Sequence, residues 1–181
     1  MCPVCRNGCS EQLKKMKKYS LFAITALSLI FLDQLTKYWV GTFMSLHDSI
    51  PVINGFFSLT YVRNPGAAFG FLAGASPAFR YTFFIAVNIV AITLILSYIR
   101  KATMAEFRLI LALACIMAGA VGNLIDRIRF GEVVDFLDFY IGTLHWPAFN
   151  VADSSISVGA CFLIWELWQR GRTSGRLSNQ D

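Results

Sequence analysis

The chain has 181 residues, a formal net charge of +5 and a hydrophobic fraction of 56%, compared with about 45 to 50% in a typical soluble domain. Its apolar residues are grouped in blocks long enough to cross a bilayer, which is typical of a membrane protein and excludes an ordinary soluble domain. The excess of basic residues indicates membrane topology and contact with anionic lipid, not nucleic-acid binding, because a basic groove with interleaved aromatic residues is absent from the sequence pattern.

The first eighteen residues precede the first apolar block and are predicted to form a disordered, basic cytoplasmic leader. Cys2, Cys5 and Cys9 have a spacing that resembles a metal or redox knuckle, but a fourth ligand of matching kind is missing. Residues 14–32 combine a basic start with an apolar run, as in a signal peptide. Because no small-residue cleavage pattern follows before Asp33, we expect a retained first membrane span.

Four apolar segments are predicted to be transmembrane helices that form one compact domain over residues 19–170. Two of them carry no charge, and at 1.5 Å per residue each nearly or fully crosses a hydrocarbon core about 30 Å thick. The first and the last contain charged residues near one end. The fold class expected is therefore a membrane all-α bundle. The spans are residues 19–41, 81–99, 109–125 and 151–168, and residues 171–181 follow as a cytoplasmic tail.

Clusters of basic residues precede the first span, separate the second from the third and follow the fourth. Because positively charged loops are retained in the cytoplasm, both termini are predicted to be cytoplasmic. The loops 42–79 and 126–150, with most of the acidic residues, then lie on the external face.

The first external loop is predicted to form a small twisted β-sheet on the membrane surface. An Asn-Gly turn at 54–55 joins two β-rich segments, and apolar and polar residues alternate over 57–61. The loop continues into residues 64–70, where Pro65 and Gly66 fix a turn. The small residues there fit either an ordinary surface turn or close approach of a bound chain to the backbone.

Polar residues at the external ends of the first and third spans share helix faces. Asp33 and Lys37 are four residues apart, which favours a structural ion pair with the lysine stem extending toward lipid headgroups. Asn123, Asp126 and Arg127 place an amide, an acid and a guanidinium on one face of the third span. They either brace the external loop that follows or contact a substrate.

Two aspartates at the membrane edge are candidate catalytic residues. Asp135 lies in the second external loop, and Asp153 opens the last span. Taking a carboxylate away from bulk water costs free energy that ordinary packing does not repay. Two adjacent carboxylates do not both ionise easily, so one pKa rises while the other stays low, and the pair provides an acid and a base that can cut a peptide with water.

Five motifs occur in order along the chain: DQLTK at 33–37, NPGAAF at 64–69, GNLIDR at 122–127, VVDF at 133–136 and FNVADS at 149–154. In this order and at these membrane positions they resemble the bacterial lipoprotein signal peptidases (signal peptidase II), over roughly residues 19–170. The resemblance implies an intramembrane aspartyl protease that removes signal peptides from prolipoproteins, cleaving before a cysteine that carries a diacylglyceryl group. It implies no metal or cofactor.

By this resemblance Asp135 and Asp153 are the catalytic dyad. Asp135 is the expected protonated member, because its loop carries apolar neighbours that desolvate it, whereas the helix dipole favours a negative charge on Asp153. The loop from residue 64 to residue 71 is expected to close over the bound peptide. The expected pocket residues are Asn64, Gly66, Asn123, Arg127 and Asn150, and the expected structural supports are Asp33, Lys37 and Asp126.

The implied partners are lipid-modified prolipoproteins and membrane lipid, with the enzyme acting as a monomer in the bacterial inner membrane and its active site at the external face. Two alternative functions also use polar groups in the membrane. A proton-coupled transporter should place its carboxylates near the bilayer midplane within repeats, and no repeat is visible here. A serine/lysine signal peptidase would use Lys37 as its base, but no serine stands in a recognisable nucleophile motif.

Overall fold

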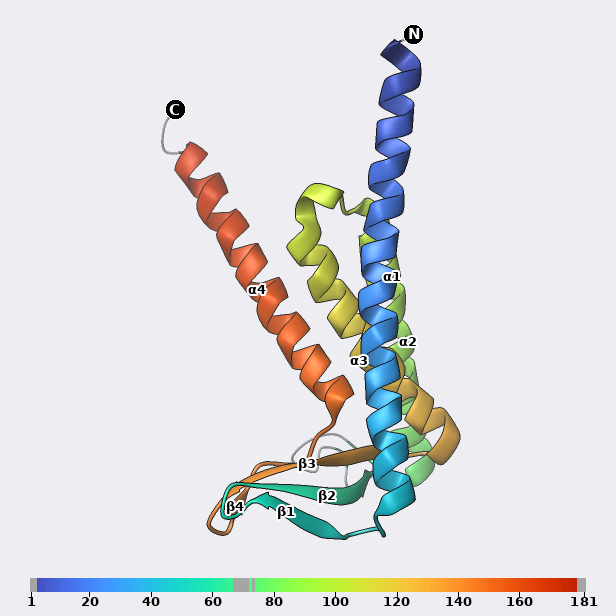
Figure 1. Cartoon of the computed structure of the whole chain (residues 1–181), viewed down its shortest axis with the longest axis vertical. Coiled ribbons are helices and arrows are strands. Elements are labelled where there is room, and N and C mark those ends of the chain that lie inside the picture. The colour runs from blue at the N-terminus through green and yellow to red at the C-terminus, as the bar shows by residue number, and fades with distance from the viewer. Residues whose placement is uncertain (1–2, 67–71, 73, 179–181) are drawn as a thin grey trace.

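A computed structural model describes residues 3–66, 72 and 74–178, with side chains from residue 10 to residue 172 except at 67–71 and 73. The long helices lie above a small sheet at one end of the molecule (Figure 1). The helices are α1 (Pro3–Phe43), α2 (Pro77–Lys101), the short 3-10 helix η2 (Met104–Glu106), α3 (Phe107–Phe130) and α4 (Val151–Ser178), and the strands are β1 (Ser49–Ile53), β2 (Phe57–Asn64), β3 (Val133–Ile141) and β4 (Leu144–His145).

The predicted membrane fold of four apolar helices with a small sheet is confirmed. Within the described part of the chain, four helical stretches are long and apolar enough to cross a bilayer. They are Ser10–Phe43, Pro77–Lys101, Met104–Phe130 and Val151–Arg172.

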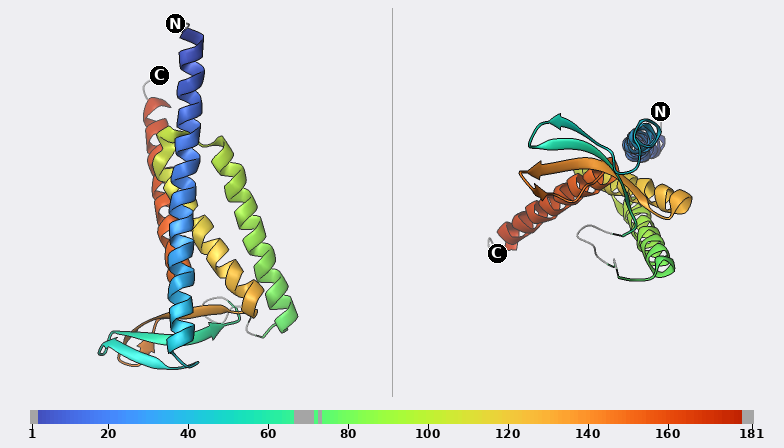
Figure 2. Two further views of the ribbon diagram at one scale, coloured as in Figure 1. Left: turned by 45° about the vertical axis from the view of Figure 1, so that its right-hand side comes forward. Right: turned by 90° about the horizontal axis from the view of Figure 1, so that it is seen from below.

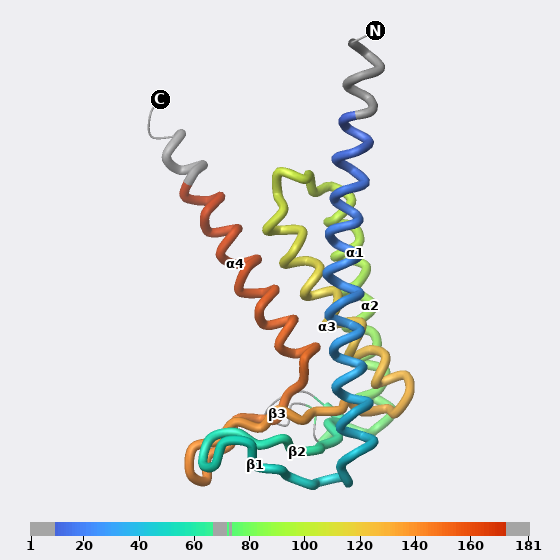
Figure 3. Tube along the Cα trace, viewed as in Figure 1, coloured from blue at the N-terminus to red at the C-terminus, as the bar shows by residue number. Residues whose placement is uncertain are grey.

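Helix α3 forms the centre of the bundle. In its most apolar window 67% of the residues are buried, against 11 to 17% in the other three spans, and it packs against α1, α2 and α4 (Figure 2). Contact with α4 is close because glycines stand at the crossing: a Cβ at Gly119 would overlap the Ala152 carbonyl oxygen, and one at Gly159 would lie 2.7 Å from the Ala112 carbonyl oxygen. Helix α4 is close to the other helices near the sheet and leans away from α1 toward its own C-terminal end (Figure 3).

The four strands are antiparallel and lie in the order β1-β2-β3-β4. The predicted hairpin is present, with Gly55 at φ 78° in the turn between β1 and β2. Asp135, which was expected on a loop, instead lies within β3 opposite Val62. The error has a physical reason: β-branched and aromatic residues make 133–141 a good strand, but its partner β2 is about seventy residues away in sequence, so local patterns do not reveal the pairing.

The first eighteen residues were predicted to be a disordered leader, but residues 3–18 of the structure belong to helix α1. Residues 11–18 are mainly Glu, Gln, Leu, Lys and Met, which have high helix propensity, and they extend a helix whose costly first turn is already formed. Cys2 and the side chains of Cys5 and Cys9 lie outside the described part of the chain.

Candidate active site

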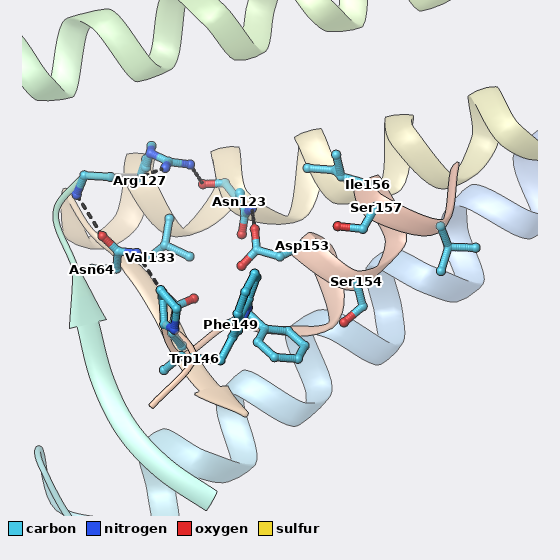
Figure 4. Close-up of a pocket in the computed structure, with 15 residues that line it drawn as sticks. Asn64, Asn123, Arg127, Val133, Trp146, Phe149, Asp153, Ser154, Ile156 and Ser157 are labelled. Atoms are coloured by element: carbon cyan, nitrogen blue, oxygen red, sulfur yellow. Dashed lines mark hydrogen bonds between the residues drawn. The ribbon is translucent and has the colours of Figure 1, made fainter. Parts of the chain in front are cut away.

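Asp135 and Asp153 line one cleft of about 550 Å³ next to the sheet. Asp135 comes from β3 and has 2% of its surface exposed, whereas Asp153 comes from the first turn of α4 and is half-buried. Four of the five predicted pocket residues, Asn64, Gly66, Asn123 and Arg127, line the same cleft (Figure 4). The structure therefore brings together polar side chains from β2, α3, β3 and α4.

The carboxyl group of Asp135 accepts one hydrogen bond on each oxygen. Asn64 Nδ2 donates to Oδ2 over 2.9 Å, and Asn150 Nδ2 donates to Oδ1 over 2.7 Å. Burial, reinforced by the negative charge of Asp153, raises the pKa of Asp135 from its ordinary value of 3.8 to about 7, although the two amide hydrogen bonds act in the opposite direction. Near neutral pH this carboxyl group can therefore hold a proton.

Asp153 accepts a hydrogen bond on each of its carboxyl oxygens. Asn123 Nδ2 donates to its Oδ1 over 2.7 Å, and the backbone N–H of Asn150 donates to its Oδ2 over 3.3 Å. In return, Asn150 Oδ1 accepts from the backbone N–H of Asp153 over 2.8 Å, a reciprocal cap at the start of α4. The amides and the helix N-terminus favour negative charge at this position.

Asn150, the fifth predicted pocket residue, is fully buried behind the cleft and is absent from the cleft lining. Its side chain reaches Asp135, and its backbone and side chain form the cap with Asp153. It thus orients both aspartates from behind.

A buried ion network supports the site. Lys37 Nζ lies 2.9 Å from Asp33 Oδ2 and 2.8 Å from Asp126 Oδ2, and it donates to Asn123 Oδ1 over 3.1 Å. Lys37 is 4% exposed, so the expectation that its stem extends toward headgroups is wrong. Two carboxylates at the α1–α3 contact hold the ammonium inside, because a buried charge must be paired. A lysine held in this way is also a poor candidate for the base of a serine/lysine peptidase.

Gln34 belongs to this network and was missed by the sequence analysis. Its Nε2 lies 3.1 Å from both Asp33 Oδ2 and Asp126 Oδ1. The only signal in the sequence was its place inside the first motif, because a glutamine on a membrane helix otherwise has no specific meaning.

Arg127 both faces the cleft and braces a turn. Its Nη2 donates to the Gly66 carbonyl and its Nη1 to the Asn123 carbonyl, each over 3.3 Å, and its guanidinium lies 4.8 Å from the centre of the Phe84 ring. The backbone N–H of Gly66 donates to Asn64 Oδ1 over 3.0 Å. The turn that starts at Asn64 is therefore tied to α3. Residues 67–71, which were expected to close over a peptide, lie outside the described part of the chain.

Apolar and small residues complete the cleft, and the sequence analysis had not assigned them to it. Trp146 and Phe149 line the cleft with Asp153 (Figure 4). Ile156 and Ser157 follow Asp153 by three and four residues, the spacing that places them on its helix face, so this signal was available. The other lining residues are Val133, Pro147, Ala148, Ser154 and Val158.

Asp138, a neighbouring acid on β3, contacts other residues than Asp135 does. Its Oδ1 lies 2.9 Å from His145 Nδ1, and its Oδ2 accepts from Thr60 Oγ1 over 3.2 Å. It does not line the cleft.

Comparison with known proteins gives one consistent result. The sequence profile of the family described as Signal peptidase (SPase) II matches residues 25–169. A protein of Syntrophus aciditrophicus named lipoprotein signal peptidase is 54% identical over 154 residues, which cover 85% of this chain and 96% of the relative. A protein of Geobacter sulfurreducens with the same name is 50% identical over 154 residues, covering 85% of this chain and 95% of the relative.

Two solved structures, each described as a bacterial membrane enzyme studied by the in meso method, have similar folds. One superposes with a TM-score of 0.73 at 37% identity and covers 82% of this chain and 87% of its own. The other has a TM-score of 0.72 at 35% identity and covers 81% of this chain and 91% of its own. Together with the profile match, these similarities establish that the chain belongs to the signal peptidase II family, the membrane aspartyl proteases that remove signal peptides from prolipoproteins.

Proposed function

We propose that Asp135 and Asp153 are the catalytic pair and that the substrate is a prolipoprotein cleaved before a diacylglyceryl-modified cysteine. The observation that carries this proposal is the shared cleft, where the two carboxyl groups are held in unlike environments. Asp135 is almost fully buried with a raised pKa, and Asp153 receives N–H donors at the start of α4. This asymmetry is what a general acid and a general base require.

The chemical step then uses one water molecule and no covalent adduct. Asp153, as the carboxylate, takes a proton from the water while its oxygen attacks the scissile carbonyl carbon. Protonated Asp135 donates to the carbonyl oxygen, which becomes the hydroxyl group of a tetrahedral intermediate. As the C–N bond breaks, the proton on Asp153 passes to the leaving nitrogen, and the hydroxyl proton returns to Asp135. Both carboxyl groups end in their starting states.

The polar residues of the cleft would orient the peptide on both sides of its scissile bond. Arg127 and Asn123 present donors from α3, and Asn64 and Gly66 form the tied turn opposite them. On α4 the cleft wall continues as Ile156 and Val158. The acyl chains of the substrate would lie against this apolar wall within the bilayer, which avoids extracting them at about 0.8 kcal/mol per CH₂.

Both termini are proposed to be cytoplasmic, with the cleft at the external face of the bacterial inner membrane. Support comes from the basic residues. The N-terminal part of α1 and the C-terminal end of α2 lie opposite the sheet (Figure 1), and they carry Lys14, Lys15 and Arg100. A reporter fused after Arg172 checks the orientation. It should be active as a cytoplasmic reporter, and activity only on the external side would contradict the arrangement.

The enzyme is proposed to act as a monomer, because both candidate aspartates are held by hydrogen bonds from side chains of their own chain. The decisive experiment is cleavage by purified enzyme in detergent of one precursor in two forms, with and without the diacylglyceryl group on its cysteine. Only the lipidated form should be cut at an appreciable rate. Equal rates would reject the lipid requirement but leave a peptidase, whereas no cleavage of either form would reject the proposed activity.

A further inference from the structure

A second pocket of about 520 Å³ lies at the end of the helices that is remote from the sheet. It is formed where the N-terminal part of α1 passes the connection between α2 and η2. Four of its lining residues are basic. The pocket is lined by Ser10, Glu11, Lys14, Lys15, Lys18, Arg100, Ala102, Thr103 and Met104.

Lys18 fixes the geometry of this pocket. It is 5% exposed, and its Nζ donates to the carbonyl oxygens of Ile99 and Ala102, each over 2.9 Å, with the Arg100 carbonyl at 3.4 Å. A lysine ammonium at the last carbonyls of α2 satisfies groups that have no partner within the helix. This contact ties α1 to the end of α2 and places Lys14 and Lys15, one turn earlier on α1, beside Arg100.

The other three basic residues of the pocket form no ion pair among the described residues. They are Lys14, Lys15 and Arg100, and all three are exposed. Glu11 is the one acid among the lining residues. The neighbouring Glu106 is already engaged, with Arg170 Nη1 at 2.7 Å and the Thr103 backbone N–H at 2.7 Å.

The length of α2 would place the pocket at the depth of lipid headgroups if the helix crosses the bilayer from the face that carries the sheet. Helix α2 has 25 residues, so it is about 37 Å long, close to the separation between the two headgroup layers of a bilayer. Helix α2 starts at the end of the molecule that carries the sheet and ends at the opposite end (Figure 2), where its Arg100 lines the pocket. Tyr19, whose ring lies 4.6 Å from Lys18 Nζ, is partly exposed beside it, as is usual for an aromatic residue at the interface.

We propose that this pocket binds the phosphate group of an anionic phospholipid headgroup, with Lys14, Lys15 and Arg100 as its ligands. Basic pockets between membrane helices are suited to anionic headgroups, and each nearby Lys or Arg contributes about 1 kcal/mol to such binding. Residues 10–18 precede the region that matches the family profile. The pocket shares no lining residue with the peptidase cleft, so the two sites can be tested separately.

The test uses the full chain in a non-ionic detergent and phosphatidylglycerol with a fluorescent acyl chain, titrated by fluorescence anisotropy. The pocket variant is Lys15→Gln with Arg100→Gln. Its matched control is Lys17→Gln with Lys101→Gln, which removes one charge from each of the same two helices at positions outside the pocket lining. Lys18 is left intact, because its three carbonyl contacts are structural. Circular dichroism confirms that each variant is folded.

The pocket variant should bind phosphatidylglycerol about tenfold to thirtyfold more weakly than the parent, and the control should lose no more than about threefold. Phosphatidylglycerol that occupies the peptidase cleft contributes equally to all three proteins, so the difference between the variants reports on the pocket. Equal losses in both variants would show diffuse electrostatic attraction and overturn the proposal. So would equal binding of fluorescent phosphatidylcholine, or full competition by millimolar inorganic phosphate at constant ionic strength, which would assign the pocket to a free anion.

Discussion

Asp33 Oδ1 accepts a hydrogen bond from the backbone N–H of Ala152 over 2.8 Å. Ala152 immediately precedes Asp153. In the same way, Asp126 Oδ2 accepts from the backbone N–H of Val134 over 3.2 Å, and Val134 immediately precedes Asp135. Each member of the candidate dyad therefore follows a backbone amide that is fixed by a buried acid, and Lys37 links the two acids. The network sets the positions of the two carboxyl groups without occupying the cleft.

The dyad assignment predicts that Asp135→Asn and Asp153→Asn each lower cleavage of a lipidated precursor by at least about a hundredfold. Asparagine keeps the shape of aspartate but neither takes up nor releases a proton near neutral pH. Substrate binding should largely persist, and the thermal midpoint should be equal to or higher than that of the parent, because one of two interacting carboxylates is removed. Cleavage rates and thermal unfolding in the same detergent check both expectations.

Asp138→Asn is the matched control, since Asp138 is on the same strand but contacts His145 and Thr60 instead of the cleft. It should retain most of the activity. A dead Asp138 variant, or a dyad variant that cuts at the parental rate, would reject the assignment.

The raised pKa of Asp135 predicts how activity depends on pH. Its carboxyl group holds a proton below about pH 7, so kcat/KM for the lipidated precursor should fall as the pH rises through that value. Because the pKa is higher in the folded state than in the unfolded state, the stabilising contribution of this group is fully present below pH 3.8 and is lost as the pH rises to about 7. A profile of kcat/KM measured from pH 5 to pH 9 tests the predicted loss of activity. Constant activity to pH 9 would contradict a protonated Asp135.

The turn at Gly66 should matter more for catalysis than for folding. Gly66 is buried at the cleft, with its N–H and its carbonyl both engaged. Because a β-branched side chain stiffens the backbone of this turn, we expect Gly66→Val to lower cleavage at least about tenfold with little change in the thermal midpoint. The control is Gly74→Val, where a Cβ would meet no atom within 4 Å. Losses of similar size in stability and activity would make this an ordinary folding turn.

Lys37→Met should destabilise the protein by about 3 to 5 kcal/mol, because it leaves two buried carboxylates without their cation. Thermal unfolding in detergent measures the change. The matched control is Lys17→Met, which alters an exposed lysine on the same helix and should have little effect. If the two variants had the same thermal midpoint, the buried network would have no structural role.

Gly119→Ala should disrupt the contact between α3 and α4, since the added methyl group would overlap the Ala152 carbonyl oxygen and the Ile156 side chain. Overpacking of this kind typically costs about 1 to 3 kcal/mol. The start of α4 carries Asp153, so cleavage should fall along with the thermal midpoint. Gly171→Ala on the same helix as Asp153 meets no atom within 4 Å and should leave both unchanged. Unchanged melting of Gly119→Ala would show that the helices separate there at no cost.

The sequence by itself determined the four apolar spans, the hairpin at Asn54 and Gly55 and the candidate aspartates. Each of these rests on a short-range property: hydrophobic length, turn chemistry, or an acid at the edge of an apolar block. Local patterns pointed to Asp135 and Asp153 as candidate residues. The resemblance to the lipoprotein signal peptidases is what predicted that the two act together as a catalytic pair.

Only the tertiary structure decided how those residues are held. The strand that carries Asp135 depends on pairing with β2, and the burial of Lys37 depends on α3 supplying Asp126 beside Asp33. The amide of Asn150 meets Asp135 because β3 and the start of α4 converge. These contacts join residues from 15 to 119 positions apart, and a local pattern carries no signal for which distant partner satisfies a buried polar group, because that choice is made by packing of the whole fold.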